Sequence, residues 1–514
     1  MITLDLIMFA ALIAAILSGF PVAFSIAGIA VIFGTIGSMT GVMDFGLFGA
    51  LGQRFFSTIT NEVLIAIPLF VFMGAVLEKS EIAADLLETM GRQFRSLRGG
   101  LGVSVILVGA LLAASTGIVG ATVTAMGLIA LPTMLKNGYD PKLAAGIVCT
   151  AGTLGQIIPP STMLIILSDV MSNAFQQAQY AQGKFSIETI SVGQIFAAAL
   201  VPGLLLVSIY IVYVLGYAFL NPKVAPGLAV DEKPSFSVVF GALVPPVLLI
   251  LAVLGSILGG IATPTEAASV GAVGAILLTA WKLKANRLLV IGSVLSLGVL
   301  AVAAGVYPVR LQRSDIGIGD WVLAGVYLLM AAIIFYGLFA GLTKSLKTGM
   351  LVPAVTSSLT VTTMIFATIL AASMFSLVFV GLGGDETMAA ILEQMPGGPT
   401  GALIFCMVLI FILGFFIDFV EITVIVLPVT VPILIAMGHD PIWLAILIAI
   451  NLQTSFLTPP FGFSLFYLRG AAPKEITTAH IYGGVAPFIL LQIIAVALIW
   501  IFPALTTWLP RALF

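Results

Sequence analysis

The stretch MLKNGYDPKLAAGIVCTAGTLGQIIPPS (134–161) recurs without a gap as LIAMGHDPIWLAILIAINLQTSFLTPPF (434–461), at an offset of 300 residues. Each copy carries Gly-x-Asp-Pro near its start and a pair of prolines near its end. Asp followed by Pro starts a helix well, because Asp caps free N–H groups and Pro suits the first helical position. A proline pair inside an apolar helix instead removes donors and breaks the helix. The repeat therefore predicts two broken helices, 141–171 and 441–468.

The composition requires lipid as the main solvent of this chain. Of its 514 residues, 61% are hydrophobic and 8% are charged, whereas soluble proteins carry roughly 25% charged residues. Its 20 Lys and Arg against 22 Asp and Glu give a net charge of −2, so no basic face exists to bind nucleic acid. Two cysteines and two histidines exclude a disulfide framework and nearly exclude a metal centre built from these side chains.

Apolar segments of about 20 residues can cross a hydrocarbon core of roughly 30 Å. Two apolar stretches, 100–135 and 401–437, are too long for one span, while half of either is short for a full crossing. We expect both to be re-entrant hairpins. The segments that fit a single span are 3–19, 22–40, 60–77, 193–219, 237–260, 265–281, 288–306, 321–342, 349–381 and 482–508.

The charged loops predict an orientation, because short loops rich in Lys and Arg face the cytoplasm. Arg92, Arg95 and Arg98 precede the first hairpin and Lys136 follows it, which places both of its ends inside. Loop 382–400 contains no cation, so we expect the second hairpin to enter from outside. The duplication is then inverted in the membrane, and inverted repeats with broken helices are typical of secondary transporters.

The chain resembles the large membrane subunit of tripartite ATP-independent periplasmic (TRAP) transporters, and the resemblance covers most of its length. The stretches that carry it are GYDPKLAAGIVCTAGTLGQIIPPS (138–161), VPPVLLILAVLGSILGGIATPTEAASVGA (244–272), GFFIDFVEITVIVLP (414–428) and LQTSFLTPPFGFSLFYLRGAAP (452–473). Two regions depart from it. Residues 288–342 insert two spans, and the first hairpin tip, ASTGIVGAT (114–122), differs from the expected Ser-Gly-Ser-like tip.

The resemblance implies an all-α polytopic protein of the bacterial inner membrane, similar to the ion transporter superfamily, with inverted repeats, two re-entrant hairpins and two broken helices. It implies sodium-coupled import of an organic acid by an elevator mechanism, without enzymatic activity and with sodium as coupling ion rather than a cofactor. The implied partners are a small four-helix membrane subunit, a periplasmic substrate-binding protein and membrane lipid.

Five regions follow from the spans and the repeat. They are scaffold spans with an amphipathic interfacial helix (1–99), the first hairpin with its broken helix (100–171), further scaffold spans including the insertion (172–400), the second hairpin with its broken helix (401–470) and a C-terminal span (471–514). We expect the interfacial helix over 79–98, where apolar residues recur at helical spacing.

Hairpin tips and helix breaks supply the candidate site. Sodium is a hard cation that suits hydroxyls, carbonyls and carboxylates, although membrane Ser and Thr often only bond their own backbone. The predicted sodium ligands are Ser115, Thr116, Gly117, Gly155, Ile158, Asp418, Thr454, Ser455 and Thr458. The predicted substrate contacts are Thr122, Gln156, Ser161 and Asn451.

Asp418 is the sharpest of these candidates, because a carboxylate inside an apolar segment is costly and by default functional. Glu421 shares its helical face and is a second ligand, a proton-coupled group or a carboxylate turned to a wet cavity. Glu266 instead completes a Thr-Pro-Thr-Glu capping box. Two other functions stay open, namely a stand-alone ion-coupled carrier or antiporter and a membrane-embedded enzyme, although the enzyme would need a catalytic cluster that the sequence does not display.

Overall fold

The computed structural model describes the chain except for residues 1–2, 95, 118, 228–234, 310–311 and 313–315. Every regular element in these described parts is a helix, which confirms the all-α expectation. The first half contains α1 (Leu4–Leu17), α2 (Val22–Met39), η1 (Phe45–Ala50), α3 (Leu51–Ile59), α4 (Glu62–Lys79), α5 (Ile82–Phe94), α6 (Gly100–Thr116), α7 (Val119–Lys136), α8 (Pro141–Thr153), η2 (Leu154–Gln156), α9 (Thr162–Ala181), α10 (Val192–Leu220) and α11 (Phe236–Leu258). The second half contains α12 (Pro264–Lys282), α13 (Arg287–Val306), α14 (Ile318–Lys347), α15 (Leu351–Gly381), α16 (Gly384–Glu393), α17 (Gly398–Leu413), α18 (Phe419–Ile425), α19 (Leu427–Ala436), α20 (Pro441–Leu457), α21 (Phe463–Ala471), α22 (Thr478–Ile501) and α23 (Ala504–Leu513).

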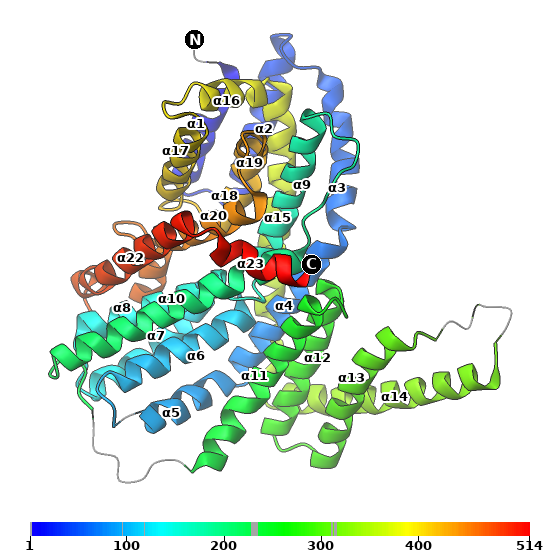
Figure 1. The fold of residues 1–514 in the computed structure, drawn as a ribbon, viewed down its shortest axis with the longest axis vertical. Coiled ribbons are helices and arrows are strands. Elements are labelled where there is room, and N and C mark those ends of the chain that lie inside the picture. Colours follow the sequence, from blue (N-terminus) through cyan, green and yellow to red (C-terminus); the bar gives the residue numbers. More distant parts are fainter. Residues whose placement is uncertain (1–2, 95, 118, 228–234, 310–311, 313–315) are drawn as a thin grey trace.

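The helices run in two main directions (Figure 1). α9, α15, α17 and α19 follow the long axis of the molecule, whereas α5, α6, α10 and α22 lie across it. α13 and α14 pack on each other and project from the remaining helices. Among the described residues, seven helices are long and apolar enough to span a membrane, or up to ten if each bent pair forms one span.

Both broken helices form as the repeat predicts. Asp140 caps α8, with Oδ1 accepting from the N–H groups of Lys142 at 2.9 Å and Leu143 at 3.1 Å. Asp440 caps α20 in the same way, through the N–H of Trp443 at 2.9 Å. The prolines lie in the gaps before α9 and α21, and the Pro159–Pro160 and Pro459–Pro460 peptide bonds are both cis.

Each long apolar stretch is divided into two arms. α6 and α7 meet at Gly117, and α17 is followed after residues 414–418 by α18 and α19. α6 and α7 have 17 and 18 residues, or about 26 Å at 1.5 Å per residue. Glu266 caps α12 as expected, because its Oε2 accepts from the N–H of Thr263 at 2.8 Å.

Three boundaries differ from the sequence prediction. The first broken helix extends beyond its predicted end at residue 171, because α9 continues to Ala181. Loop 382–400 contains α16, and the C-terminal span ends at Ile501, with α23 following it. The length of an apolar segment does not reveal such helix ends, because polar residues such as Gln are also good helix formers.

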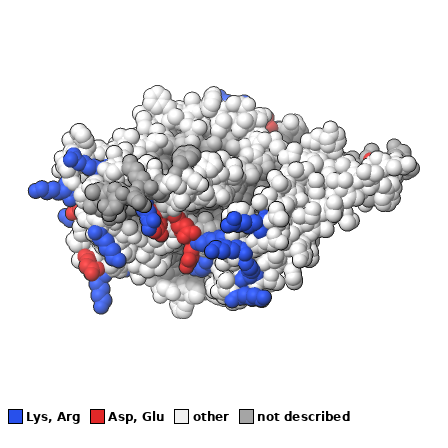
Figure 2. All heavy atoms as spheres, turned by 90° about the horizontal axis from the view of Figure 1, so that it is seen from below, with Lys and Arg blue, Asp and Glu red and all other residues white. Residues whose placement is uncertain are grey.

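Lys and Arg gather on one end of the molecule (Figure 2). Asp85 on α5 pairs with Lys282 at the end of α12 at 2.7 Å. Lys344 on α14 donates from Nζ to the carbonyl oxygens of Leu283 at 2.7 Å and Lys284 at 2.6 Å. The basic ends of α12 and α14 therefore lie together beside α5, as expected for the cytoplasmic side.

Candidate functional site

The first helix break is largely buried. Gly155 and Gln156 lie in η2, and the Oγ of Ser161 donates to the carbonyl oxygen of Gln156 at 3.1 Å. Gln156 and Ser161 are 0% exposed, whereas Ile158 is only partly buried. Among the described residues, neither polar atom of the Gln156 side chain has a hydrogen-bond partner. A buried amide without partners carries a desolvation cost, so this break offers both a donor and an acceptor to a ligand.

The first hairpin tip contacts this break. Gly117 has a φ of 61°, and its carbonyl oxygen accepts from the Oγ1 of Thr162 at 2.9 Å. Thr162 was missed by sequence reasoning, because only packing brings it to the tip. Thr122 lies buried on α7. The side chains of Ser115 and Thr116 lie outside the described residues.

The hydroxyls of the second break bond the backbone of their own helix. Thr454 donates to Ile450, Ser455 to Leu452 and Thr458 to Thr454, through carbonyl oxygens 2.7–2.8 Å away. Each oxygen still carries acceptor lone pairs. Asn451 donates from Nδ2 to the carbonyl oxygen of Met407 on α17 at 2.8 Å. Asn451 therefore connects the broken helix to the first arm of the second hairpin.

The second hairpin tip lies against the same helix. A Cβ added at Gly414 would come within 2.0 Å of the Ser455 Oγ, so this approach requires glycine. Asp418 is half-buried and caps α18, with Oδ1 accepting from the N–H of Phe419 at 2.8 Å. Glu421 is 5% exposed, and its Oε2 has no hydrogen-bond partner in the described part of the chain.

The two broken helices meet in the interior, a few residues before their breaks. The Nε2 of Gln453 donates to the Oγ1 of Thr153 at 3.3 Å, and these residues are 300 positions apart. The Sγ of Cys149 approaches the carbonyl oxygen of Ser464 at 3.8 Å. The helix packing is reciprocal, because α7 packs against α21 while α19 packs against α9. Each hairpin is thus joined to the broken helix of the other half.

Several buried polar atoms near the breaks and hairpins have no hydrogen-bond partner among the residues that the structure describes. In addition to Gln156 and Glu421, these are the Oγ1 atoms of Thr150 and Thr423 and the Oε1 of Gln453. Sequence reasoning missed Thr150, Thr423 and Gln453, and it ranked Glu421 below Asp418. No sequence signal separates them from ordinary polar residues in helices, because only packing decides which ones lose water. Among the described residues no group of three or more His, Cys, Asp and Glu side chains could hold a metal ion.

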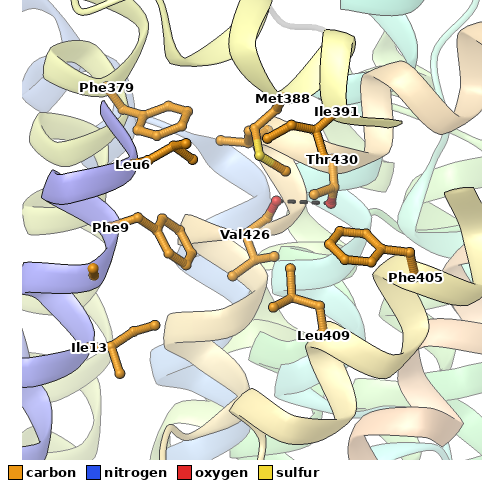
Figure 3. A pocket seen from close by; sticks show the side chains of 12 residues that line it. Leu6, Phe9, Ile13, Phe379, Met388, Ile391, Phe405, Leu409, Val426 and Thr430 are labelled. Carbon is orange, nitrogen blue, oxygen red and sulfur yellow. Dashed lines mark hydrogen bonds between the residues drawn. The ribbon is translucent and has the colours of Figure 1, made fainter. Parts of the chain in front are cut away.

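An apolar cavity of about 260 Å³ lies between α1, α15, α16 and the second hairpin (Figure 3). Phe9 and Phe405 line it from α1 and α17. Its hydroxyl group, on Thr430, donates to the carbonyl oxygen of Val426 at 3.0 Å. The cavity therefore lacks both the hydrogen-bond donors that an anion requires and the set of oxygen ligands that a sodium ion requires.

Long apolar helices, two of which are broken in the interior and met there by hairpin tips, define a polytopic helical membrane transport protein. The chain belongs to the family described as "Tripartite ATP-independent periplasmic transporter, DctM component", whose model matches residues 8–307 and 317–505. It is therefore an inner-membrane protein and not an enzyme.

Similar proteins include two large permeases. The C4-dicarboxylate TRAP transporter large permease protein DctM of Vibrio cholerae is 27% identical, covering 90% of this chain and 89% of its own. The ectoine TRAP transporter large permease protein TeaC of Halomonas elongata is 26% identical, covering 98% of each chain. The YdaH transporter of Alcanivorax borkumensis shares the fold, with a TM-score of 0.53, 15% identity and coverage of 89% of this chain and 88% of that one.

Proposed function

We propose that this chain imports an organic acid by sodium-coupled secondary transport, as the large subunit of a tripartite transporter. The main observation in support of the proposal is the hydrogen bond between Thr153 and Gln453. Residues related by a two-fold axis can contact each other only near that axis, and these two are counterparts at the repeat offset. Broken helices that meet in this way, with buried polar atoms still unpaired, fit the arrangement that secondary transporters use for substrate and ions.

The mobile part of the transporter comprises residues 100–171 and 401–470, which are the two hairpins with their broken helices. Residues 1–99, 172–400 and 471–514 form the scaffold. The reciprocal packing of the hairpins supports this division, because it ties both halves into one body. An elevator movement would carry that body past the scaffold. α13 and α14 are the two spans of the segment 288–342, and they project from the remaining helices.

Sodium is held by hydroxyl and carbonyl oxygens at the tips and breaks, with a carboxylate at the second tip. The sodium ligands are Ser115, Thr116, Gly117, Gly155, Ile158, Asp418, Thr454, Ser455 and Thr458. Thr122, Gln156, Ser161 and Asn451 contact the substrate. The free amide atoms of Gln156 support its role, because a substrate carboxylate or hydroxyl would satisfy them.

The partners are a small four-helix membrane subunit and a periplasmic substrate-binding protein. The word "tripartite" in the family description supports both. The substrate is an organic acid, a class supported by the C4-dicarboxylate relative. Because one relative is an ectoine permease, ectoine is a further compound to test as the substrate.

Uptake into proteoliposomes tests this function. The complete transporter, with its small subunit and loaded binding protein, should accumulate radiolabelled succinate, malate or ectoine above the outside concentration when an inward sodium gradient is imposed. Omitting either partner should abolish accumulation. Accumulation by this chain alone would instead support the stand-alone carrier. Failure of the complete transporter with all three compounds would contradict the proposal.

A further inference from the structure

A cavity with several polar side chains in its wall lies between the scaffold and the proposed mobile part. It has a volume of about 270 Å³, near the lower end of the roughly 300–1,000 Å³ common for small-molecule sites. α3, α4 and α15 line one side, while α9, α18 and α19 line the other. Val424 and Pro428 of the second hairpin form part of its wall. The cavity therefore lies at the boundary between the scaffold and the proposed mobile part, which contains the helix breaks.

Arg54 on α3 supplies a cation to this cavity. In the described part of the chain its guanidinium donates one hydrogen bond, from Nη1 to the carbonyl oxygen of Ser373 at 3.3 Å, and forms no ion pair. A guanidinium has five N–H donors. Arg54 is exposed, so its remaining donors can reach a ligand that enters from water.

The one acid that lines the cavity is already hydrogen-bonded. Asp169 on α9 accepts from the Nδ2 of Asn61 at 2.9 Å through Oδ1, and from the Nδ2 of Asn173 at 3.4 Å through Oδ2. Asp169 and Asn173 also line an adjoining cavity of about 410 Å³. The polar lining therefore continues along α9, while Arg54 stays available to an anion.

The direction of α4 indicates that the cavity lies away from the basic end of the molecule, and therefore on its outer side. This helix runs from Glu62 to Lys79 and leads into α5, where Asp85 pairs with Lys282 on the basic end. Arg54 precedes α4 and therefore lies toward its opposite, outer end. Cations are depleted on that side of membrane proteins, so an unpaired arginine there calls for a functional explanation.

We propose that Arg54 is the first carboxylate-binding residue of the transport path, and that this cavity holds an incoming organic acid before it reaches the helix breaks. The inference rests on the proposed import function. An arginine pairs with a carboxylate through two parallel hydrogen bonds. The side-chain amides of Asn173 and Gln177, which also line the cavity, supply donors to the rest of the acid.

Uptake kinetics test the role of Arg54 in the complete transporter, with succinate, malate or ectoine, whichever the wild-type protein accumulates. Arg54→Gln should raise the half-saturating concentration about 10-fold or more, the usual cost of losing a charged hydrogen bond. Arg54→Lys should have a smaller effect, because it keeps the charge but loses the planar pair of donors. Lys184→Gln is the matched control, since Lys184 is an exposed cation of the loop after α9.

A labelling experiment measures occupancy of the cavity without transport. Cys149 and Cys406 are buried, so Ser376→Cys introduces the accessible thiol, at a partly exposed position of the cavity wall. Succinate, or the compound that is accumulated, should slow its reaction with a membrane-impermeant maleimide. The same protection in Arg54→Gln should require about 10-fold more compound.

The outcomes separate the two proposals. If the wild-type transporter accumulates none of the compounds, the proposed function fails. If it accumulates one of them while Arg54→Gln matches Lys184→Gln in kinetics and in protection, the Arg54 site alone is refuted. Thermal unfolding in detergent identifies a misfolded Arg54→Gln protein, in which case the smaller change Arg54→Lys decides by the same comparison.

Discussion

Gln453 donates a hydrogen bond from Nε2 to the Oγ1 of Thr153 at 3.3 Å, across 300 residues of sequence. Both side chains are fully buried, and they occupy equivalent positions of the repeat. Thr153 also donates to the carbonyl oxygen of Thr150 at 2.9 Å. The two halves of the protein are thus hydrogen-bonded to each other next to both helix breaks.

Removing both partners of this hydrogen bond should cost less than the sum of the costs of removing each one alone. Thr153→Val leaves the buried amide of Gln453 without this acceptor and should lower the free energy of unfolding by about 1–3 kcal/mol. The double variant Thr153→Val/Gln453→Leu should lose less than the sum of the two single variants. Unfolding in mixed micelles measures these differences. Thr360→Val, at an exposed backbone-bonded hydroxyl on α15, should stay within about 0.5 kcal/mol of wild type.

Gly117→Ala should destabilise the first hairpin tip. Gly117 and Gly349 have φ values of 61° and 74°, so alanine at either position costs about 1–2 kcal/mol through backbone strain. Only at Gly117 would the new Cβ lie 2.8 Å from the backbone N and Oγ1 of Thr162, whereas Gly349 faces open space. We therefore expect Gly117→Ala to cost at least about 1 kcal/mol more. Equal losses in a thermal unfolding comparison would contradict the contact between tip and break.

Alanine at two other glycines should have opposite effects. Gly414→Ala places a Cβ 2.0 Å from the Ser455 Oγ and should separate the second tip from α20, reducing both stability and transport. Gly216→Ala on α10 meets open space and should stabilise the protein by about 0.5–1 kcal/mol, because alanine is the better helix former. A stable and fully active Gly414→Ala protein would show that this approach is not needed.

Asp418→Asn should remove the negative charge of the second hairpin tip without removing the helix cap. Asparagine caps a helix about as well as aspartate, so α18 should keep its start and the protein its stability. If Asp418 binds sodium, the sodium concentration that gives half-maximal uptake should rise about 10-fold, the result of losing roughly 1.4 kcal/mol of binding. An unchanged sodium dependence would remove Asp418 from the ion site.

The helix breaks and caps could be predicted from sequence because local residues determine them. Asp140 and Asp440 cap their helices whatever lies around them, and paired prolines interrupt a helix in any setting. The contact between Thr162 and Gly117 could not be predicted, because it depends on how a hairpin folds back on a distant segment. The same holds for the unpaired Glu421 oxygen and for the cavity beside Arg54. The hydropathy of the sequence also predicts the end of this helix at residue 171, whereas α9 ends at Ala181. The last turns of α9 are polar but still helical.

Sodium-driven accumulation tests the central claim most directly. The complete transporter is reconstituted, and uptake of the accumulated compound is compared under an inward sodium gradient, an inward proton gradient and no gradient. We expect accumulation above the outside concentration with the sodium gradient alone, and none without a gradient. Accumulation under the proton gradient but not the sodium gradient would contradict it.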